Sequence, residues 1–241
     1  MTTLRETTAQ IQRRVGVNAD GVWGPASADA VAKALAVEQF DRQAFLLSFI
    51  NTNATAITDE DIRLAAVRLG VTTRHIKMLR KVESGGRSFD DRGRPIILFE
   101  PHIFYRRTQG RYGSTSFSNR TWDRSLYPKS YDGRWQQMAD AAEKDAAAAV
   151  ESASWGLWQI MGFHWNTLGY ESAWDFAASV VKSEAGHLEA LVRFIEANGL
   201  QDELAACEAG KPDSCRPFAR AYNGTGYAQN NYHVKMAEAL R

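Results

Sequence analysis

The sequence has little of several features that mark specialised classes of protein. Its 241 residues include 29 basic and 28 acidic side chains, a net charge of +1, so no excess of positive charge is available to attract DNA or RNA. No stretch approaches the roughly 18 consecutive apolar residues of a membrane span, and the first residues lack the apolar core of a signal peptide. We therefore expect a protein that is made in the cytoplasm, without a nucleic-acid partner or an integral membrane segment.

Cysteine is also scarce, since Cys207 and Cys215 are the only two in the chain. Their short spacing would allow a disulfide in an oxidising compartment, and a pair of free thiols in the cytoplasm is the alternative. Two cysteines without a nearby histidine argue against a zinc site. We expect neither a metal nor a cofactor.

What the sequence does have is an ordinary globular composition with many aromatic residues. Hydrophobic residues make up 44% of the chain and charged residues 24%, as in soluble globular proteins. Several of the 7 Trp, 8 Tyr and 11 Phe lie in surroundings rich in Gly, Asn and Ser. Such rings suit a sugar-binding cleft, where they lie against pyranose rings, although we expect most of them to belong to the core.

The first 37 residues read as a small helical unit. Ile11 and Val15 mark the inner face of a first helix, a glycine turn follows at residues 18–21, and Pro25 can begin a second helix. Residues 38–57 read as a connecting helix that leads into a polar linker. Residues 58–241 form the remaining, larger unit.

The larger unit is predicted to be mostly helical. Thr58 and Asp61 form a capping-box pattern at the start of a helix that Gly70 ends. Residues 94–108 predict a short strand that passes into a helix, and residues 110–134 predict a long loop of the kind that is often functional. Further helices are expected at residues 137–151, 174–197 and 231–240.

One acidic residue, Glu83, has an unusual position. A threonine at position 72 or 73 can start a helix that Gly85 stops, with Ile76, Leu79 and Glu83 on its apolar stripe. Burial and the negative end of the helix dipole both disfavour a charged carboxylate there, so we expect a raised pKa and a proton-donating acid. The alternative is a solvent-facing glutamate that reaches this position by chance.

Four stretches of the larger unit occur together in an order that indicates a family. They are "VESGG", "LFEPHIFYR", "SWGLWQIMG" and "FARAYNGTGYAQNNY". In this order they resemble the lysozyme superfamily, and most closely the muramidase domain of modular phage endolysins, over about residues 58–241. The resemblance implies a mostly α fold, in which a small helical unit precedes a larger lysozyme-like helical domain with at most a small β element.

The stretch "VNADGVWGPASADAV" resembles the peptidoglycan-binding module of cell-wall hydrolases. The match covers roughly residues 8–37 of the segment 1–37, and it implies that Asp20 and Trp23 belong to a wall-binding site. The alternative is a relic that only packs on the next domain.

The resemblance also implies a site. Glu83 would be the catalytic acid that protonates the glycosidic oxygen. The substrate-binding residues would be Ser84, Glu100, His102, Trp155, Gln159, Tyr222, Asn223 and Tyr227. Structural roles remain open for three of them, because Trp155 can be core, Gln159 can hydrogen-bond buried backbone, and Glu100 can cap the helix that follows it.

A second carboxylate is not identified by any motif. The candidates are Asp90, Asp91, Glu100 and Asp123. Glu100 is the preferred supporting group, whereas "SFDDRGRP" is more typical of a turn in which arginines hold Asp90 and Asp91. The sequence therefore leaves open whether hydrolysis retains or inverts the anomeric configuration.

The predicted function is hydrolysis of the β-1,4 bond between N-acetylmuramic acid and N-acetylglucosamine by a monomeric endolysin. Its partner would be the glycan strands of bacterial peptidoglycan, reached in the periplasm after a separate factor permeabilises the membrane. One alternative is a lytic transglycosylase that gives 1,6-anhydro products. Another is a non-catalytic wall-binding or phage structural protein.

Overall fold

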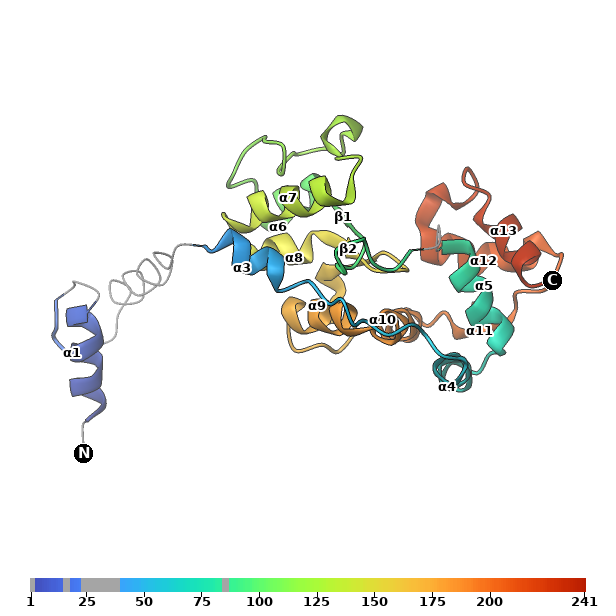
Figure 1. Cartoon of the computed structure of the whole chain (residues 1–241), viewed down its shortest axis with the longest axis horizontal. Coiled ribbons are helices and arrows are strands. Elements are labelled where there is room, and N and C mark those ends of the chain that lie inside the picture. Colours follow the sequence, from blue (N-terminus) through green and yellow to red (C-terminus); the bar gives the residue numbers. More distant parts are fainter. Residues whose placement is uncertain (1–2, 15–17, 23–39, 84–86) are drawn as a thin grey trace. The chain divides into compact units, whose positions relative to one another are not determined.

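The computed structural model describes residues 3–14, 18–22, 40–83 and 87–241 (Figure 1), and of Leu4, Arg14 and Glu83 it describes the backbone only. The chain divides into two compact units, Met1–Gln43 and Ala44–Arg241. Helices predominate in the described part, with one small sheet, so the predicted mostly α fold is confirmed. None of the described helices is both long and apolar enough to cross a bilayer.

The described part of the smaller unit is a helix, α1 (Leu4–Arg14), and the turn at residues 18–22. Gln12 is buried: its Nε2 donates to Asp20 Oδ1 and to the Val22 carbonyl, both at 2.9 Å, and its Oε1 accepts from the Gly21 N–H at 2.9 Å. The expected inward position of Ile11 is wrong, since Ile11 is exposed. The polar residue Gln12 takes the buried position because it binds the turn.

The conformation of this turn depends on both Asp20 and Gly21. Asp20 Oδ1 also accepts from the Val22 N–H at 2.9 Å, and the Val22 and Gln12 hydrogen bonds lower the pKa of Asp20. Gly21 has φ +74°, and a Cβ there would lie 2.8 Å from the Arg5 carbonyl oxygen, so only glycine fits without strain. Trp23, Val15 and Pro25 lie outside the described residues.

The larger unit contains most of the chain's secondary structure. Its helices are α3 (Arg42–Leu47, which begins just before the unit does), α4 (Asp59–Leu69), α5 (Thr73–Glu83), α6 (Pro101–Arg107), α7 (Tyr131–Ala142), α8 (Ala146–Glu151), α9 (Ala173–Lys182), α10 (Glu184–Ala197), α11 (Gln201–Ala205), α12 (Pro212–Asn223) and α13 (Tyr232–Ala239). Its strands are β1 (Ile97–Phe99), β2 (Ala153–Trp155) and β3 (Ile160–Met161), and its 3-10 turns are η1 (Arg124–Leu126), η2 (Gly162–His164) and η3 (Gly224–Tyr227).

The predicted start and stop of α4 are confirmed. The side chains of Thr58 and Asp61 each accept from the other's backbone N–H, and Gly70 ends α4 in the left-handed conformation, with φ +68°. Helix α5 follows and buries Ile76 and Leu79, as expected. Helix α13 packs against α5, so the C-terminal end of the chain supports this helix. The predicted stop at Gly85 lies outside the described residues.

The sheet is small and antiparallel, in the order β1-β2-β3. Ile97 pairs with Trp155, and Trp155 pairs with Ile160, so β2 lies between the other two strands. β1 leads into α6, which confirms the predicted strand-to-helix passage. Helix α7 packs on β1, and α8 runs directly into β2.

Two predicted long helices are each broken in two. The helix expected at 137–151 separates into α7 and α8 because Asp145 is extended (φ −158°) and caps α8 by accepting from the Ala148 N–H at 3.0 Å. The helix expected at 174–197 separates into α9 and α10 at Ser183, which is also extended and caps α10. Thr55 bridges Ser183 in parallel, and its carbonyl accepts from the Glu184 N–H at 3.0 Å. A strand-like contact from a distant segment therefore forces this second break.

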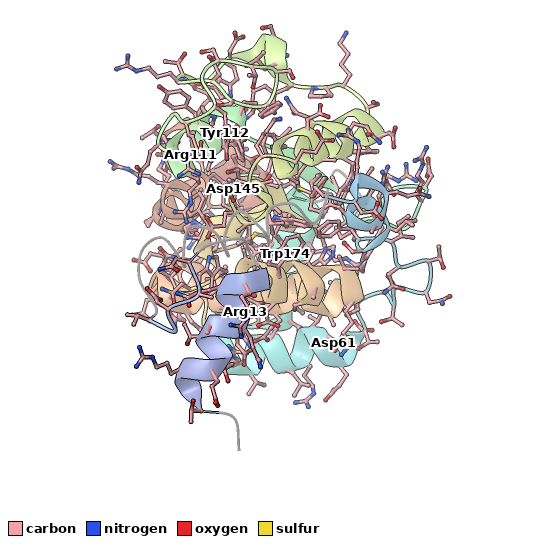
Figure 2. All side chains as sticks on the ribbon, turned by 90° about the vertical axis from the view of Figure 1, so that its left-hand side faces the viewer. Arg13, Asp61, Arg111, Tyr112, Asp145 and Trp174 are labelled. Atoms are coloured by element: carbon pink, nitrogen blue, oxygen red, sulfur yellow. The ribbon has the colours of Figure 1, made fainter. Side chains whose placement is uncertain are left out.

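Part of the predicted linker, residues 38–57, packs on the larger unit. Phe49 is buried, with its ring centroid 5.0 Å from that of Trp135 and 5.5 Å from that of Trp155. Phe45 and Phe49 both contact Trp174, which lies near the start of α9 (Figure 2). These aromatic rings join α3, α7, β2 and α9 in one core.

The turn that follows α5 is built on Asp90, as its composition predicts. Asp90 Oδ1 accepts from the N–H groups of Arg92 and Arg94 at 2.9 and 3.0 Å, and Oδ2 pairs with the Arg94 Nη2 at 2.7 Å. The side chains of Asp90 and Arg94 are 4% and 3% exposed, whereas that of Asp91 is 83% exposed and pairs with Arg87. Asp90 is therefore a buried residue that holds the turn, whereas Asp91 is a surface residue.

We expect Asp90→Asn to lower the free energy of unfolding by about 3 kcal/mol, because the buried guanidinium of Arg94 loses its nearest carboxylate. Asp91→Asn is the matched control and should leave stability unchanged, since its partner is a solvent-exposed arginine. Denaturant unfolding followed by circular dichroism measures both. Equal stability of the two variants would contradict the structural role of Asp90.

Candidate functional site

The predicted acid, Glu83, is the last residue of α5. Its backbone thus has the helix-end position that the sequence predicts, while its side chain and Ser84 lie outside what the structure describes. The last turn of α5 also carries Arg80 and Lys81, whose positive charges suit the negative end of a helix. The contacts of Arg80 and Ser88, which precede and follow Glu83, show how the end of α5 is fixed in place.

Glu184, in the first turn of α10, joins three segments around the end of α5. Its Oε2 accepts from the Ile57 N–H at 3.0 Å and pairs with Arg80 Nη2 at 3.2 Å, and its Oε1 accepts from the Ser88 hydroxyl. Arg80 precedes Glu83 by one turn and Ser88 follows it closely. A single carboxylate therefore holds the chain on both sides of Glu83.

The Glu184 side chain is only 15% exposed. Burial alone would raise its pKa, but the hydrogen bonds from Ser88 and Ile57 and the charge of Arg80 hold the pKa of Glu184 below its ordinary value. It is therefore ionised at neutral pH. Sequence reasoning missed Glu184, since nothing in its neighbourhood distinguishes it from an ordinary helix-start acid.

His187, one turn later, holds the hairpin formed by β2 and β3. Its Nδ1 accepts from the Leu157 N–H at 3.0 Å and its Nε2 donates to the Val180 carbonyl at 2.8 Å, which requires the neutral ring with its proton on Nε2. Gly156 has φ +68°, and a Cβ there would lie 2.6 Å from His187 Nδ1. The ring of His187 therefore leaves room only for glycine at position 156. Burial lowers the pKa of His187 to about 4.

Gln159 serves the hairpin backbone. It has a positive φ of 50°, its Nε2 donates to the carbonyls of Gly156 (2.7 Å) and Ile96 (3.2 Å), and its Oε1 accepts from the Ser154 hydroxyl at 3.0 Å. This is the backbone-bonding role that the sequence left open. The side chain is half-buried, and its remaining surface lies on the hairpin.

The expectation that Trp155 binds substrate is corrected by its burial. Its side chain is 2% exposed, and its indole N–H donates to the Val150 carbonyl at 3.0 Å. The ring packs against Trp135 and Phe176 in the aromatic core. A ring enclosed on all sides has no face to offer to a ligand.

Glu100 belongs to a half-buried polar cluster with His102 and Tyr127. The Tyr127 hydroxyl donates to Glu100 Oε2, and His102 Nδ1 lies 3.3 Å from the same oxygen. Glu100 occupies the N-cap position of α6 but makes no side-chain capping bond, so the capping role is wrong. Nothing in the sequence indicated Tyr127, which reaches Glu100 from the far end of the loop between α6 and α7.

Burial shifts the pKa values of Glu100 and His102 toward one another. It raises the pKa of Glu100 above its ordinary value, against the opposing effect of the Tyr127 hydrogen bond. It lowers the pKa of His102, and the charge of Arg106 lowers it further. Burial and the neighbouring carboxylate raise the pKa of Tyr127. Burial therefore favours the neutral forms of both Glu100 and His102.

The other candidates for a second carboxylate are held in turns. Asp123 caps η1, where its Oδ1 accepts from the backbone N–H and the hydroxyl of Ser125 at 2.9 and 2.7 Å. Asp90 and Asp91 belong to the turn after α5. Of the four carboxylates considered, Glu100 is the half-buried one without a turn or capping role.

Tyr222, Asn223 and Tyr227 lie at the end of α12 and in η3. The Tyr222 hydroxyl donates to the Trp158 carbonyl at 3.1 Å, which ties α12 to the β2–β3 hairpin, and its ring stacks on Phe218. Asn223 is the last residue of α12 and precedes Gly224, which has φ +69°. The Tyr227 ring lies edge-on to His233. The structure thus joins the end of α12 to the hairpin.

The two cysteines are buried free thiols. Cys207 lies within hydrogen-bonding reach of Cys215, which lowers the pKa of Cys215 to about 7. Of the two alternatives left by the sequence, the structure has the thiol pair. Within the described ranges, no group of three or more His, Cys, Asp or Glu residues is arranged to hold a metal ion.

Two comparisons with known proteins give matches. The family model described as N-acetylmuramidase matches residues 72–241. The crystal structure of the Burkholderia AP3 phage endolysin is similar to this chain, with a TM-score of 0.70 and 31% sequence identity, over 97% of this chain and 93% of that chain. No curated protein gives a significant match.

We expect stability to fall as the pH drops from about 6.5 to about 4, partly because of His187. Its folded pKa of about 4 lies below its ordinary 6.5, so in this window the unfolded chain binds a proton that the folded chain does not. Above pH 6.5 the contribution is fully present. His187→Gln removes this titration and should flatten the dependence by up to about 1.4 kcal/mol per pH unit. Unfolding free energies measured across this range test it, and parallel curves for the two proteins would contradict it.

Proposed function

The chain belongs to the N-acetylmuramidase family, and from this membership we propose that it hydrolyses the β-1,4 bond between N-acetylmuramic acid and N-acetylglucosamine in peptidoglycan, with Glu83 as the general acid. The observation that carries the proposal is the position of Glu83, at the end of α5 and inside the family match. Arg80 and Ser88, which flank it in sequence, are both held by Glu184.

The chemistry requires an acid that keeps its proton near neutral pH. A glycosidic oxygen is a poor leaving group until it is protonated, and the acid must donate as the bond breaks. The last turn of a helix concentrates unpaired carbonyls, whose negative potential favours the protonated form of a carboxyl group. Glu184 would act on this step by positioning, because it binds the side chains of Arg80 and Ser88, which precede and follow Glu83.

Glu100 would support the reaction from the cluster with His102 and Tyr127. A half-buried carboxyl with a raised pKa and two polar neighbours can bind a sugar hydroxyl or order the attacking water. The remaining substrate-binding residues would be Ser84, Gln159, Tyr222, Asn223 and Tyr227. The hydrogen bond from Tyr222 to Trp158 supports this set, since it joins the α12 end to the hairpin that carries Gln159.

The similarity to a phage endolysin supports a role in host-cell lysis. In this proposal the protein is a monomer that is made in the host cytoplasm and reaches the periplasm after a separate factor permeabilises the membrane. Its small N-terminal unit would bind the wall through Asp20 and Trp23. The Asp20 turn supports this, because Gln12 and Gly21 hold it in one conformation.

We expect Glu83→Gln and Glu83→Ala to fold normally and to lose nearly all release of soluble fragments from purified peptidoglycan, because neither can protonate the leaving group. Mass spectrometry of wild-type products should show reducing-end muramic acid. Retained turnover in Glu83→Gln would remove the general-acid assignment. Products with 1,6-anhydro ends would instead identify a lytic transglycosylase, in which the substrate's own 6-hydroxyl attacks.

Deletion of residues 1–37 should leave a folded, slower enzyme with weaker sedimentation on purified peptidoglycan. The reason is that the proposed wall-binding unit is lost while the family match, residues 72–241, stays intact. Asp20→Ala in the full chain is a milder version, since it removes only the carboxylate that holds the turn. Unchanged sedimentation after the deletion would show that the unit does not bind the wall.

A further inference from the structure

The loop between α6 and α7, residues 108–130, differs in charge from the rest of the chain. It carries four cations, Arg111, Arg120, Arg124 and Lys129, against one carboxylate, Asp123. The whole chain has a net charge of only +1, so the remainder is net negative. A local excess of positive charge on a nearly neutral protein marks a surface for an anionic partner.

Within the described part of the chain, no carboxylate pairs with any of these four cations. Elsewhere in the larger unit, Arg63 pairs with Glu60, Arg87 with Asp91 and Arg216 with Asp213. In the loop, Arg111 lies over the ring of Tyr112 (Figure 2), and Asp123 is bonded to Ser125. The charge of the loop therefore remains available to a ligand.

The loop also presents an exposed aromatic ring. Trp122 is 61% exposed, and its ring centroid lies 6.0 Å from that of Tyr127, whose hydroxyl donates to Glu100. Arg120 and Arg124 lie two residues before and after Trp122. A tryptophan face, flanked by cations and next to a carboxylate cluster, suits a ligand that is both sugar and anion.

The loop is held in place by buried polar side chains. Gln137, from α7, is 5% exposed, and its Nε2 donates to the carbonyls of Ser116 and Leu126 at 2.6 and 2.7 Å. The Ser118 hydroxyl donates to the Gly113 carbonyl at 2.7 Å, and that of Tyr112 to the Lys144 carbonyl at 2.8 Å. The loop backbone that carries Trp122 is therefore held in place, so binding of a ligand there loses little backbone conformational entropy.

We propose that this loop is a second binding surface for the peptidoglycan strand, additional to the residues around Glu83, and the proposal rests on the function proposed above. Trp122 stacks on the face of a pyranose ring. Arg120, Arg124 and Lys129 pair with the carboxylates of the stem peptides that the muramic acid residues carry. The surface thereby favours glycan strands that still bear their peptides.

An anionic membrane could attract the same cations, but the apolar content of the loop argues against it. Among its residues, Trp122 is the one large hydrophobic side chain that is strongly exposed. Insertion into a bilayer needs a wider apolar face, such as one side of an amphipathic helix. Binding of a glycan strand with stem peptides needs only an aromatic ring for the sugar and cations for the peptide carboxylates.

The test uses the full chain with Glu83→Gln in every sample, so that cleavage does not alter the binding partner. Trp122→Ala and the double variant Arg120→Gln/Arg124→Gln are compared with the control Arg63→Gln/Lys182→Gln, which removes two exposed cations from α4 and α9. Sedimentation is measured with intact peptidoglycan, with chitin, which is an insoluble β-1,4 glycan of N-acetylglucosamine without carboxylates, and with vesicles of anionic lipid. Unfolding free energies confirm that each variant is folded.

We expect Trp122→Ala to bind both glycan preparations about tenfold more weakly. The double arginine variant should be weaker on intact peptidoglycan only, with a smaller dependence on salt, whereas the control should match the parent. Parent-like binding by both loop variants would overturn the proposal, as would a loss confined to the lipid vesicles. Whether the protein with Glu83 intact cleaves peptidoglycan is a separate measurement, so failure of the proposed function is distinguishable from failure of this surface.

Discussion

The first turn of α10 is the contact on which the rest of the larger unit depends. Glu184 ties Arg80 of α5, Ser88 and the backbone of Ile57 together, and His187 ties the β2–β3 hairpin to the end of α9. Both residues are largely buried, so their hydrogen bonds act in a low dielectric, where a missing partner is costly. The chain breaks between α9 and α10 at Ser183, so α10 begins with a first turn of its own. This break makes the contacts of both Glu184 and His187 possible.

Glutamine amides fix irregular backbone at three places in the chain. Gln12 binds the turn that holds Asp20, Gln137 binds the loop that carries Trp122, and Gln159 binds the hairpin at Gly156. An amide both donates and accepts, so one side chain can satisfy several backbone groups that no helix or sheet pairs. In each case the segment that is fixed belongs to a surface proposed to meet the cell wall.

The carboxylates of the larger unit fall into distinct roles that their environments set. Asp90 is buried against Arg94 and holds a turn, Glu184 is kept ionised by its partners, and Glu100 has a raised pKa beside Tyr127. Three carboxylates of one unit therefore differ in their partners, and Glu184 and Glu100 differ in the direction of their pKa shifts. Membership of the N-acetylmuramidase family gives these differences a use, since glycosidic cleavage needs an acid and an oriented water.

The sequence by itself determined what local chemistry controls. The capping box at Thr58, the stop at Gly70 and the end of α5 at Glu83 could be read directly, because caps and apolar stripes depend on residues a few positions apart. The four stretches that indicate the family were likewise visible. These features indicate the family and place Glu83, the proposed acid, at the end of a helix.

Only the tertiary structure decided the rest, because it depends on partners far away in the chain. Thr55 breaks the long helix at Ser183, and Tyr127 turns Glu100 from a capping residue into a member of a polar cluster. Trp155 looked suited to a sugar, but packing of Phe176 and other rings encloses it in the core. Periodicity and propensity carry no information on such long-range contacts, since a side chain's burial and pKa are set by whatever the fold brings against it.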